Sequence, residues 1–496
     1  MLLSSVIYFL IIEIVLSQNP IGLRASASLR GLLLGAAIRV QNLRENVDAG
    51  QYNATVLKNY QVVVPEGELK PKHIWINENV YNFTDSDWLI DWTEKNQMQL
   101  RGHNLVWATD SCIPKWIIDQ EASITPDKAK SLLSDYIHTV VGRYRGRIPW
   151  WDVVNEAIED SYNNTHPFNL RDCLWLRKLG PDFIKYAFMF AHEADSNLKL
   201  YYNDYNLEMT GKKANRTIEL VNWLRSEGAA IHGIGLQWHI GVSKTIIPND
   251  THYQSAQHFI DNKLDIMVTE LDVAIPTKGF DPIDPADLQK QGQVYLSMLE
   301  YVLYFSPYCR AFLTWGFTDR YSWIPYSSNF TRGDGLPLNR TYQPKPAYWQ
   351  MQDKLARLID NGIYRISPKS QSNQCLATFT NGTSNGVQLN QGTCNQSNEQ
   401  WNVTWLDDGT YRLSTLDVSN RALEALNATA RIGGLQMNNW TGDVNQEWVI
   451  SSTETKLYYI GPRQAWWRVV TVYENSTVDI LDRNHSVSQS WILTKI

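Results

Sequence analysis

From about Leu32 to Leu358 the chain alternates between short apolar runs and longer amphipathic stretches. The apolar runs are Leu32–Val40, Gln61–Pro65, Gln99–Trp107, Ile148–Val154, Leu198–Asn203, Ile231–Trp238, Leu264–Thr269 and Cys309–Trp315. The clearest helix-like segments between them are Lys128–Tyr144, Pro181–Asp195, Lys212–Glu227 and Leu288–Phe305. Strands that alternate with helices form parallel βαβ units, so this α/β pattern predicts a (β/α)8 TIM barrel. A doubly wound open sheet is the alternative, and it accounts less well for the polar ends of the strands.

Almost every apolar run finishes in polar or aromatic residues. At these ends, in chain order, stand Glu66, Lys70, His103, Trp107, Asn155, Glu156, Tyr205, Gln237, His239, Glu270, Asp272 and Trp315, with Trp323 shortly after the last run. In a barrel the carboxyl ends of all strands converge on one face, where active sites of this fold are built. The pattern therefore predicts a single polar and aromatic cleft.

After about Leu358 the helix-like segments stop, and short strand-like runs with Gly, Asn and Ser turns follow. Residues 398–401, 445–448 and 488–491 form a weak repeat that ends in Trp each time. Three all-β units of similar length predict a threefold-symmetric module. We expect a signal peptide at 1–17, the barrel at 18–358 and the all-β module at 359–496.

The composition excludes several classes of protein. With 43% hydrophobic and 19% charged residues, the chain has the make-up of a globular protein rather than a disordered one. The net charge of −6 and the lack of a basic block argue against a nucleic-acid partner and favour a neutral substrate. The 20 Trp and 25 Tyr residues suit both a Trp-rich core and platforms on which sugar rings stack.

The apolar run from Leu2 to Leu16 is short for a membrane span and is interrupted by Glu13. We expect a cleaved secretory signal, with an uncleaved anchor as the alternative, and hence a secreted, monomeric chain that is not membrane-bound after cleavage. Glycosylation sequons begin at Asn53, Asn82, Asn215, Asn329, Asn381, Asn402, Asn427, Asn439 and Asn475.

The chain has five cysteines, an odd number, so at least one cannot form a disulfide within the chain. Cys375 and Cys394 lie close in sequence and are expected to form a disulfide; Cys112 and Cys173 are a plausible second pair. Cys309 opens an apolar run and is expected to be a buried free thiol. No His or Cys group has zinc-ligand spacing, so we expect no metal and no cofactor.

Hydrolysis of a glycosidic bond needs a proton on the leaving oxygen and a nucleophile at the anomeric carbon, and two carboxylates supply both. Glu156 and Glu270 each end an apolar strand outside any run of charges. A lone Glu at a strand end is usually just solvated or ion-paired. Here Asn155 precedes Glu156, and a His239–Asp272 pair is available to orient Glu270 and keep it ionised.

The segment from about Leu32 to Trp349 resembles glycoside hydrolase family 10, the endo-β-1,4-xylanases. The matching motifs are GHNLVW at 102–107, WDVVNEA at 151–157, GIGLQWH at 233–239, TELD at 269–272, WGFTD at 315–319, Ser322-Trp323 and YQPKPAYW at 342–349. The resemblance implies a retaining mechanism on xylan, with Glu156 as acid/base and Glu270 as nucleophile.

The same resemblance implies the roles of the remaining cleft residues. Asn155, His103, Trp107, Gln237 and His239 should hold the reacting xylose. Glu66 and Lys70 should bind the next sugar on the glycone side, Trp315 and Trp323 should cover the glycone sugars, and Tyr205 should face the cleft.

Three positions depart from the family pattern. Gly67 stands where the family usually has Asn, which removes an amide and should weaken binding by about 1 kcal/mol. Ala108 replaces a His, and Trp238 replaces a small residue, so that it could narrow the cleft or add a platform. These departures put the preferred glycan in doubt, and another β-1,4-glycan is an alternative substrate. A catalytically idle carbohydrate binder is the second alternative.

The C-terminal module resembles the ricin-type β-trefoil, a carbohydrate-binding fold. Glu399 replaces Gln in its first Gln-x-Trp motif, and Ala377 and Glu424 stand where sugar-binding lobes usually have Asp. Since the Gln-x-Trp residues are chiefly core residues, they indicate the fold rather than binding. A module that only stabilises or spaces is the alternative.

Overall fold

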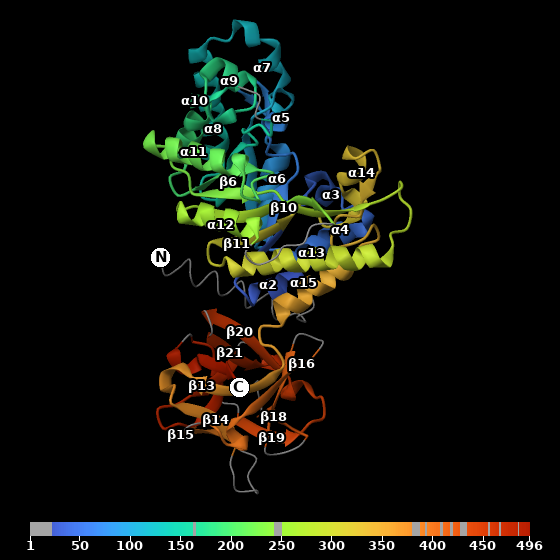
Figure 1. Ribbon diagram of the computed structural model, residues 1–496, viewed down its shortest axis with the longest axis vertical. Coiled ribbons are helices and arrows are strands. Elements are labelled where there is room, and N and C mark those ends of the chain that lie inside the picture. Colours follow the sequence, from blue (N-terminus) through green and yellow to red (C-terminus); the bar gives the residue numbers. More distant parts are fainter. Residues whose placement is uncertain are drawn as a thin grey trace. The chain divides into compact units, whose positions relative to one another are not determined.

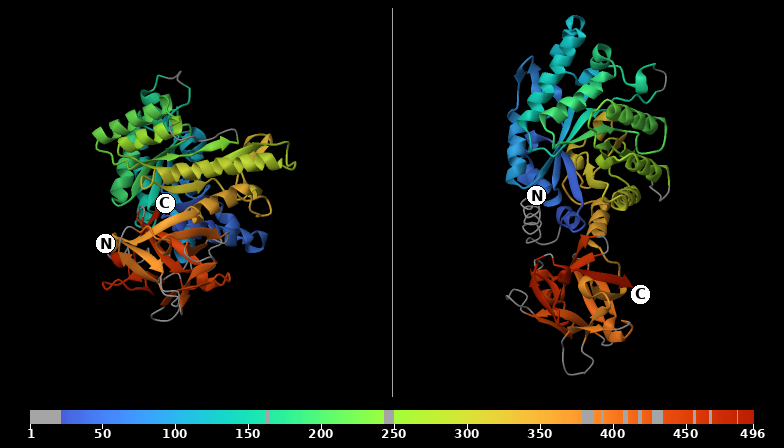
Figure 2. Two further views of the ribbon diagram at one scale, coloured as in Figure 1. Left: turned by 60° about the horizontal axis from the view of Figure 1, so that its bottom comes forward. Right: turned by 90° about the vertical axis from the view of Figure 1, so that its left-hand side faces the viewer.

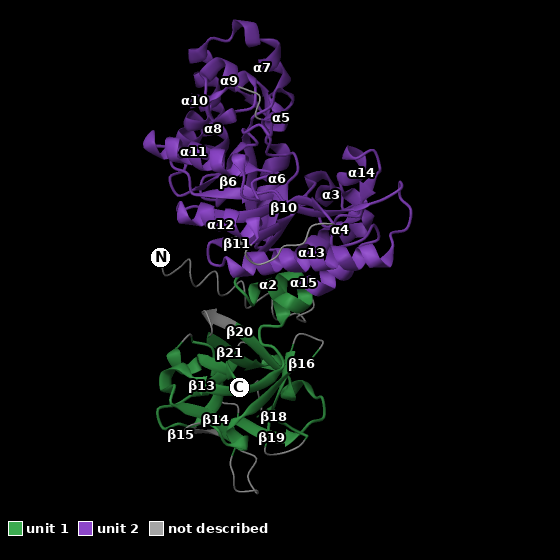
Figure 3. Ribbon diagram, viewed as in Figure 1, with its two compact units in different colours: residues 1–31, 352–496 green, residues 32–351 purple. Residues whose placement is uncertain are grey.

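The computed structural model describes residues 22–161, 165–242, 250–378, 387–391, 394–406, 410–416, 420–426, 434–454, 457–465, 468–484 and 486–496. The predicted signal segment lies outside them. The chain forms two compact units (Figure 3). One comprises residues 32–351, and the other comprises residues 352–496 together with the segment before residue 32. In the part of the chain that the structure describes, no helix combines the length and the apolar character needed to traverse a bilayer.

The larger unit is built on eight parallel strands that close into a ring. They are β1 (Leu33–Ile38), β2 (Val62–Pro65), β5 (Gln99–Trp107), β6 (Trp150–Asn155), β7 (Lys199–Asp204), β8 (Gly233–Leu236), β10 (Asp265–Pro276) and β11 (Cys309–Thr314). Each strand pairs with the next in the chain, and β11 pairs with both β10 and β1. This closure confirms the predicted barrel and excludes the open sheet.

Helices lie outside the ring of strands (Figures 1 and 2). The longer ones are α4 (Gln51–Asn59), α6 (Thr84–Lys95), α8 (Pro126–Arg143), α10 (Asp182–Ala194), α11 (Lys212–Ser226), α12 (Thr251–Asp261), α13 (Pro285–Tyr304) and α15 (Pro346–Ala356). Shorter helices are α3 (Val40–Arg44), α5 (Pro71–Ile74), α7 (Lys115–Asp119), α9 (Leu174–Leu179) and α14 (Ile324–Ser327), while α2 (Leu23–Ser28) belongs to the smaller unit. The four predicted helical segments correspond to α8, α10, α11 and α13.

Local sequence explains where α8 and α13 begin. Thr125 caps α8 by accepting a hydrogen bond from the Lys128 amide, and Asp284 caps α13 by accepting one from the Ala286 amide. A proline follows each cap at the first helical position, where a backbone N–H is not needed.

Strand β10 is longer than the predicted run Leu264–Thr269. Its second half pairs with two short strands, β9 (His239–Gly241) and β12 (Arg332–Gly333), beyond the end of β8. The other short pair is β3 (Trp75–Asn77) with β4 (Val80–Tyr81). The extension places His239 opposite Asp272 in the ladder between β9 and β10.

The smaller unit contains a closed six-stranded barrel and three two-stranded sheets. The barrel strands are β13 (Gly362–Pro368), β16 (Trp401–Leu406), β17 (Thr410–Thr415), β20 (Trp448–Glu454), β21 (Leu457–Pro462) and β24 (Trp491–Lys495). The two-stranded sheets are β14 (Gln374–Thr378) with β15 (Val387–Gln391), β18 (Arg421–Leu426) with β19 (Gly434–Asn439), and β22 (Arg468–Val472) with β23 (Val478–Asp482).

The weak repeat occupies equivalent positions in this unit. Trp401, Trp448 and Trp491 each open a barrel strand and are fully buried. Their indole N–H groups donate to the carbonyls of Leu376, Leu423 and Val470, at 2.7, 2.9 and 2.8 Å. The prediction that these Trp residues form the core is confirmed.

The cysteines follow the prediction in part. Cys375 and Cys394 form the expected disulfide, with Cα atoms 5.9 Å apart, and Cys309 is a buried free thiol. The second predicted pair is wrong: Cys112 and Cys173 are both free. Cys173 is fully buried and Cys112 is partly exposed beside the Ser111 hydroxyl, so the fold places the two thiols in different environments.

Candidate active site

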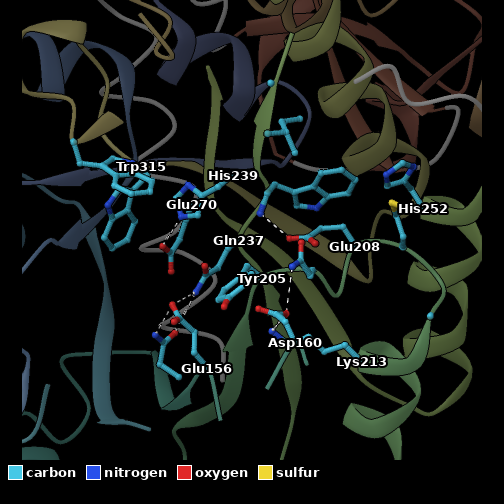
Figure 4. A pocket seen from close by; sticks show the side chains of 18 of the residues that line it. Glu156, Asp160, Tyr205, Glu208, Lys213, Gln237, His239, His252, Glu270 and Trp315 are labelled. Carbon is cyan, nitrogen blue, oxygen red and sulfur yellow. Dashed lines mark hydrogen bonds and ion pairs between the residues drawn. The ribbon is translucent and has the colours of Figure 1, made fainter. Parts of the chain in front are cut away.

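A cleft of about 1000 Å³ opens at the carboxyl ends of the barrel strands. Figure 4 shows Glu156 and Glu270 reaching into it from different strands, with Gln237 between them. Twelve of the residues picked out from the sequence line the cleft. They are Glu66, Lys70, His103, Trp107, Asn155, Glu156, Tyr205, Gln237, His239, Glu270, Trp315 and Trp323. Asp272, the thirteenth, is buried behind His239.

Glu270 lies within β10 and is only 5% exposed. The Asn203 amide donates to one carboxylate oxygen at 2.7 Å, and His239 Nε2 bonds to the other at 3.1 Å. Burial alone would raise the pKa of Glu270. The bond from His239, the charges of His103 and His239, and the bond from Asn203 together lower the pKa below its ordinary value. Glu270 is therefore held as an anion.

His239 connects two carboxylates. Its Nδ1 lies 2.9 Å from Asp272 Oδ2, and Asp272 also accepts a 2.8 Å bond from the Trp323 indole. Burial alone would lower the pKa of His239, but Asp272 and Glu270 raise it well above the ordinary value. A cationic imidazole thus lies between two anions, and this neutralises much of the charge at the buried end of the cleft.

Glu156 follows β6 with a backbone φ of 52°, in the left-handed region that side chains rarely adopt. Its amide donates to the Asn203 carbonyl at 2.9 Å, and the Tyr202 hydroxyl accepts bonds from the next two amides, at Ala157 and Ile158. These bonds stabilise the turn that directs the Glu156 side chain into the cleft.

The Glu156 carboxylate accepts hydrogen bonds on both oxygens. Asn155 Nδ2 at 3.1 Å and Gln237 Nε2 at 2.9 Å donate to Oε1, while the Trp107 indole donates to Oε2 at 3.2 Å. Arg171 Nη1 lies 3.4 Å from Oε2. At 14% exposure the carboxylate still reaches solvent, as a group that must exchange protons requires.

The sequence did not assign a role to Asn203 or Arg171. Asn203 Nδ2 donates to both Asn155 and Glu270 at 2.7 Å, so a continuous set of hydrogen bonds links the two glutamates. Its place at the end of β7 was a usable signal. Arg171 also donates to the Tyr205 hydroxyl at 3.0 Å, but it stands in a loop with no periodic pattern that could have revealed it.

The side of the cleft assigned to glycone sugars is charged and aromatic. Lys70 Nζ lies 4.7 Å from the ring centre of Trp107 and 5.6 Å from that of Trp315, and burial lowers the Lys70 pKa. Glu66 bonds to Arg39 at 3.0 Å. Beside Gly67, the His73 imidazole would be 3.1 Å from an added Cβ, so it occupies part of the space that a larger residue would need.

The His103 side chain is held by a residue buried beneath the floor of the cleft. Its Nδ1 lies 3.0 Å from Asp152, which is fully buried inside the barrel and also pairs with Arg101. The indole of Trp315 packs edge-on against the His103 ring, with ring centres 5.2 Å apart.

Trp238 lines the cleft but is too buried to provide a platform, which corrects that expectation. It is 1% exposed, and its ring stacks on His252 and packs edge-on against Tyr301. Its φ of 57° differs from the extended backbone expected in a strand, so the side chain lies within the packed wall.

This arrangement can perform acid–base and nucleophilic chemistry on a neutral, hydroxyl-rich ligand. One carboxylate is ionised and buried, the other is partly exposed, and amides and indoles surround both. Among the described residues, no group of three or more His, Cys, Asp or Glu side chains is arranged to hold a metal ion. A (β/α)8 barrel with two such carboxylates in one cleft defines the class of barrel glycoside hydrolases.

Comparison with known proteins gives the family within that class. The sequence model of glycosyl hydrolase family 10 matches residues 22–354, and the chain belongs to this family. It is 35% identical over 308 residues to endo-1,4-beta-xylanase B of Thermotoga neapolitana, covering 62% of this chain and 84% of that protein. It is 30% identical to exoglucanase XynX of Acetivibrio thermocellus, but covers only 29% of that longer protein and 66% of this chain.

The barrel is also similar to solved structures. Xylanase 10B from Thermotoga petrophila, solved in complex with xylobiose, is 31% identical to the chain with a TM-score of 0.63. The match covers 68% of this chain and 98% of that one.

Proposed function

We propose that this glycoside hydrolase is a secreted endo-β-1,4-xylanase that retains the anomeric configuration. The observation that carries the proposal is the pair Glu156 and Glu270, which face one cleft in different environments. The family membership and the xylanase relatives support xylan as the substrate.

In the first step, ionised Glu270 attacks the anomeric carbon while Glu156 donates its proton to the glycosidic oxygen. The bond to the leaving sugar breaks, and a glycosyl–Glu270 ester forms. In the second step, Glu156 takes a proton from water, the water oxygen attacks the anomeric carbon, and Glu270 leaves as a carboxylate. His239 and Asn203 stabilise that carboxylate before and after the reaction.

The remaining cleft residues hold the sugars in this scheme. Asn155 and Gln237, which both donate to Glu156 Oε1, also donate to hydroxyls of the reacting xylose. Glu66 and Lys70 bind the next glycone sugar through polar contacts. Trp315 and Trp323 cover the apolar faces of the glycone sugars, and Tyr205 faces the cleft.

The test is release of reducing sugar from xylan by the wild type, Glu156→Ala and Glu270→Ala. We expect Glu156→Ala to lose on the order of 10²–10⁴-fold in kcat, and Glu270→Ala to be at least as impaired. A reactive aryl xyloside, which needs no proton on its leaving group, should restore the bond-breaking step only in Glu156→Ala. Equal activity of all three proteins would overturn the proposal.

A different β-1,4-glycan is the second candidate substrate, since a relative is named an exoglucanase. Rates on xylan, cellulose and mixed-linkage glucan separate the two. If the wild type binds these polysaccharides and hydrolyses none, the protein is a carbohydrate binder instead.

For the smaller unit we propose the ricin-type β-trefoil fold. A six-stranded barrel, three two-stranded sheets and three equivalent buried Trp residues support it. Glu424, at the position of the usual sugar-binding Asp, is 7% exposed and accepts hydrogen bonds from Gln436 and Gln446.

Affinity electrophoresis of the full chain carrying Glu270→Ala and Trp323→Ala tests whether this unit binds sugar. Retardation by polysaccharide that survives the weakened cleft would assign a lectin-like role to the unit. Loss of all retardation would leave it a stabilising module.

A further inference from the structure

Trp238 lies in the chain between two residues that bond to the proposed catalytic glutamates. Gln237, on one side of Trp238, donates to Glu156 at 2.9 Å. His239, on the other side, bonds to Glu270 at 3.1 Å. The conformation of the Trp238 backbone therefore sets the direction of both supporting side chains.

That conformation is strained. The φ of 57° lies in the left-handed region, where the Cβ of a residue other than glycine crowds the following carbonyl oxygen. Such a conformation persists only where surrounding contacts compensate for it. The structure shows which contacts do so.

The Trp238 amide donates to Glu208 Oε1 at 2.8 Å, and Glu208 is 8% exposed (Figure 4). The Trp238 ring stacks on His252 with ring centres 5.1 Å apart and meets Tyr301 edge-on at 5.5 Å. Both the backbone and the ring of Trp238 are thus held by residues packed into the cleft wall.

The segment that carries Glu208 is tied to helix α12. Ser255 Oγ donates to the Leu207 carbonyl at 2.7 Å, and the Thr210 amide donates to the Thr251 carbonyl at 3.1 Å. Helix α12 also supplies His252. Glu208 is consequently a fixed acceptor, and its bond to Trp238 resists rotation of the 237–239 backbone.

We propose that Glu208 is a positioning residue that acts through the Trp238 amide to align Gln237 with Glu156 and His239 with Glu270. This inference rests on the proposed function, because it assigns the two glutamates their catalytic roles. Glu208 bonds to neither glutamate, but through the Trp238 backbone its effect reaches both.

The loss variant is Glu208→Met, which keeps the length and packing of the side chain but removes the acceptor. Glu208→Gln is the rescue variant, since its amide oxygen can still accept from Trp238. Thr93→Ala is the matched control, because it removes a buried hydrogen bond of the same kind, from Thr93 Oγ1 to the Ile90 carbonyl in α6, at a residue that does not line the cleft.

We expect Glu208→Met to lower kcat about 10- to 100-fold, the scale expected when reacting groups shift by about 1 Å, with little change in KM. The acid limb of its pH–rate profile should move to higher pH, because a displaced His239 no longer lowers the pKa of Glu270. Glu208→Gln and Thr93→Ala should stay near the wild type in both kcat and pH profile.

A crystal structure of Glu208→Met provides a readout that needs no substrate. The Gln237–Glu156 and His239–Glu270 contacts should exceed hydrogen-bond distance. Unchanged contacts would overturn the proposal, as would a raised KM at constant kcat, which marks a substrate contact by Glu208. An inactive wild type would instead contradict the proposed function and leave the crystallographic test in force.

Discussion

Glu270 stays ionised in a buried position because the groups around it favour the anion. His239 supplies a charged donor, and Asp272 keeps His239 protonated. The effect of Asp272 on Glu270 is indirect, since it is transmitted through the imidazole. The charge on Asp272 therefore helps to set the lowest pH at which Glu270 is ionised and the enzyme is active.

We therefore expect Asp272→Asn to move the acid limb of kcat/KM to higher pH. The Asn oxygen can still accept from His239, but without the negative charge the pKa of His239 falls. A neutral His239 no longer lowers the pKa of Glu270, so Glu270 becomes protonated, and activity is lost, at a higher pH than in the wild type. Initial rates on xylan across the acid range measure the shift.

The control for this variant is Asp281→Asn, which removes one charge from a loop residue outside the cleft. Its pH profile should match that of the wild type. An unshifted acid limb in Asp272→Asn would show that the charge of Asp272 does not reach Glu270.

At the scale of single elements, local signals set the ends of helices and contacts beyond the barrel set the length of a strand. Thr125-Pro126 and Asp284-Pro285 mark the starts of α8 and α13. The extension of β10 as far as Pro276 depends instead on pairing with β9 and β12.

Removing the cap of α13 should cost stability without affecting catalysis. In Asp284→Ala the Ala286 amide loses its 2.8 Å acceptor, which lowers the free energy of unfolding by about 1 kcal/mol. Chemical denaturation followed by circular dichroism measures this loss. Asp281→Ala, with the same change of charge and no helix cap, should be unaffected, and equal stability of the two variants would contradict the role of the cap.

At the scale of the whole molecule, catalysis and the disulfide belong to different compact units. The residues proposed for catalysis all belong to the 32–351 unit, while the disulfide lies in the other. A change in the disulfide should therefore alter stability in one unit and leave hydrolysis unchanged.

We expect replacement of both Cys375 and Cys394 by Ser to lower the stability of the smaller unit by about 3 kcal/mol, as for a loop of similar length. Scanning calorimetry should show one transition moving to lower temperature and the other unchanged. Hydrolysis below that first transition should equal that of the wild type. A loss of hydrolysis at those temperatures would show that the two units are coupled.

Much of this protein could be predicted from the order of its residues. The period of apolar residues identified strands and helices. The strand ends identified eleven residues of the cleft, and Trp323 was found just beyond the last strand. This succeeded because a parallel barrel brings the same end of every strand to one face, so that position along a strand implies position in the site.

Contacts between distant segments could not be predicted in the same way. The predicted pairing of Cys112 with Cys173 failed, the ring of Trp238 is buried in the cleft wall instead of forming a platform, and Asn203, Arg171 and Glu208 received no role. In each case the direction of a side chain depends on backbone angles and neighbours that the order of residues does not state.

The sequence by itself determined the repeating strand–helix architecture and the two strands that carry the glutamates, because these follow from local periodicity. Only the tertiary structure decided how the two carboxylates differ. Burial, the charge of His239 and the bonds from Asn203 act on Glu270, whereas Trp107, Gln237 and Arg171 surround Glu156. Electrostatic environment is a property of atoms brought together in space, and the chain acquires it only on folding.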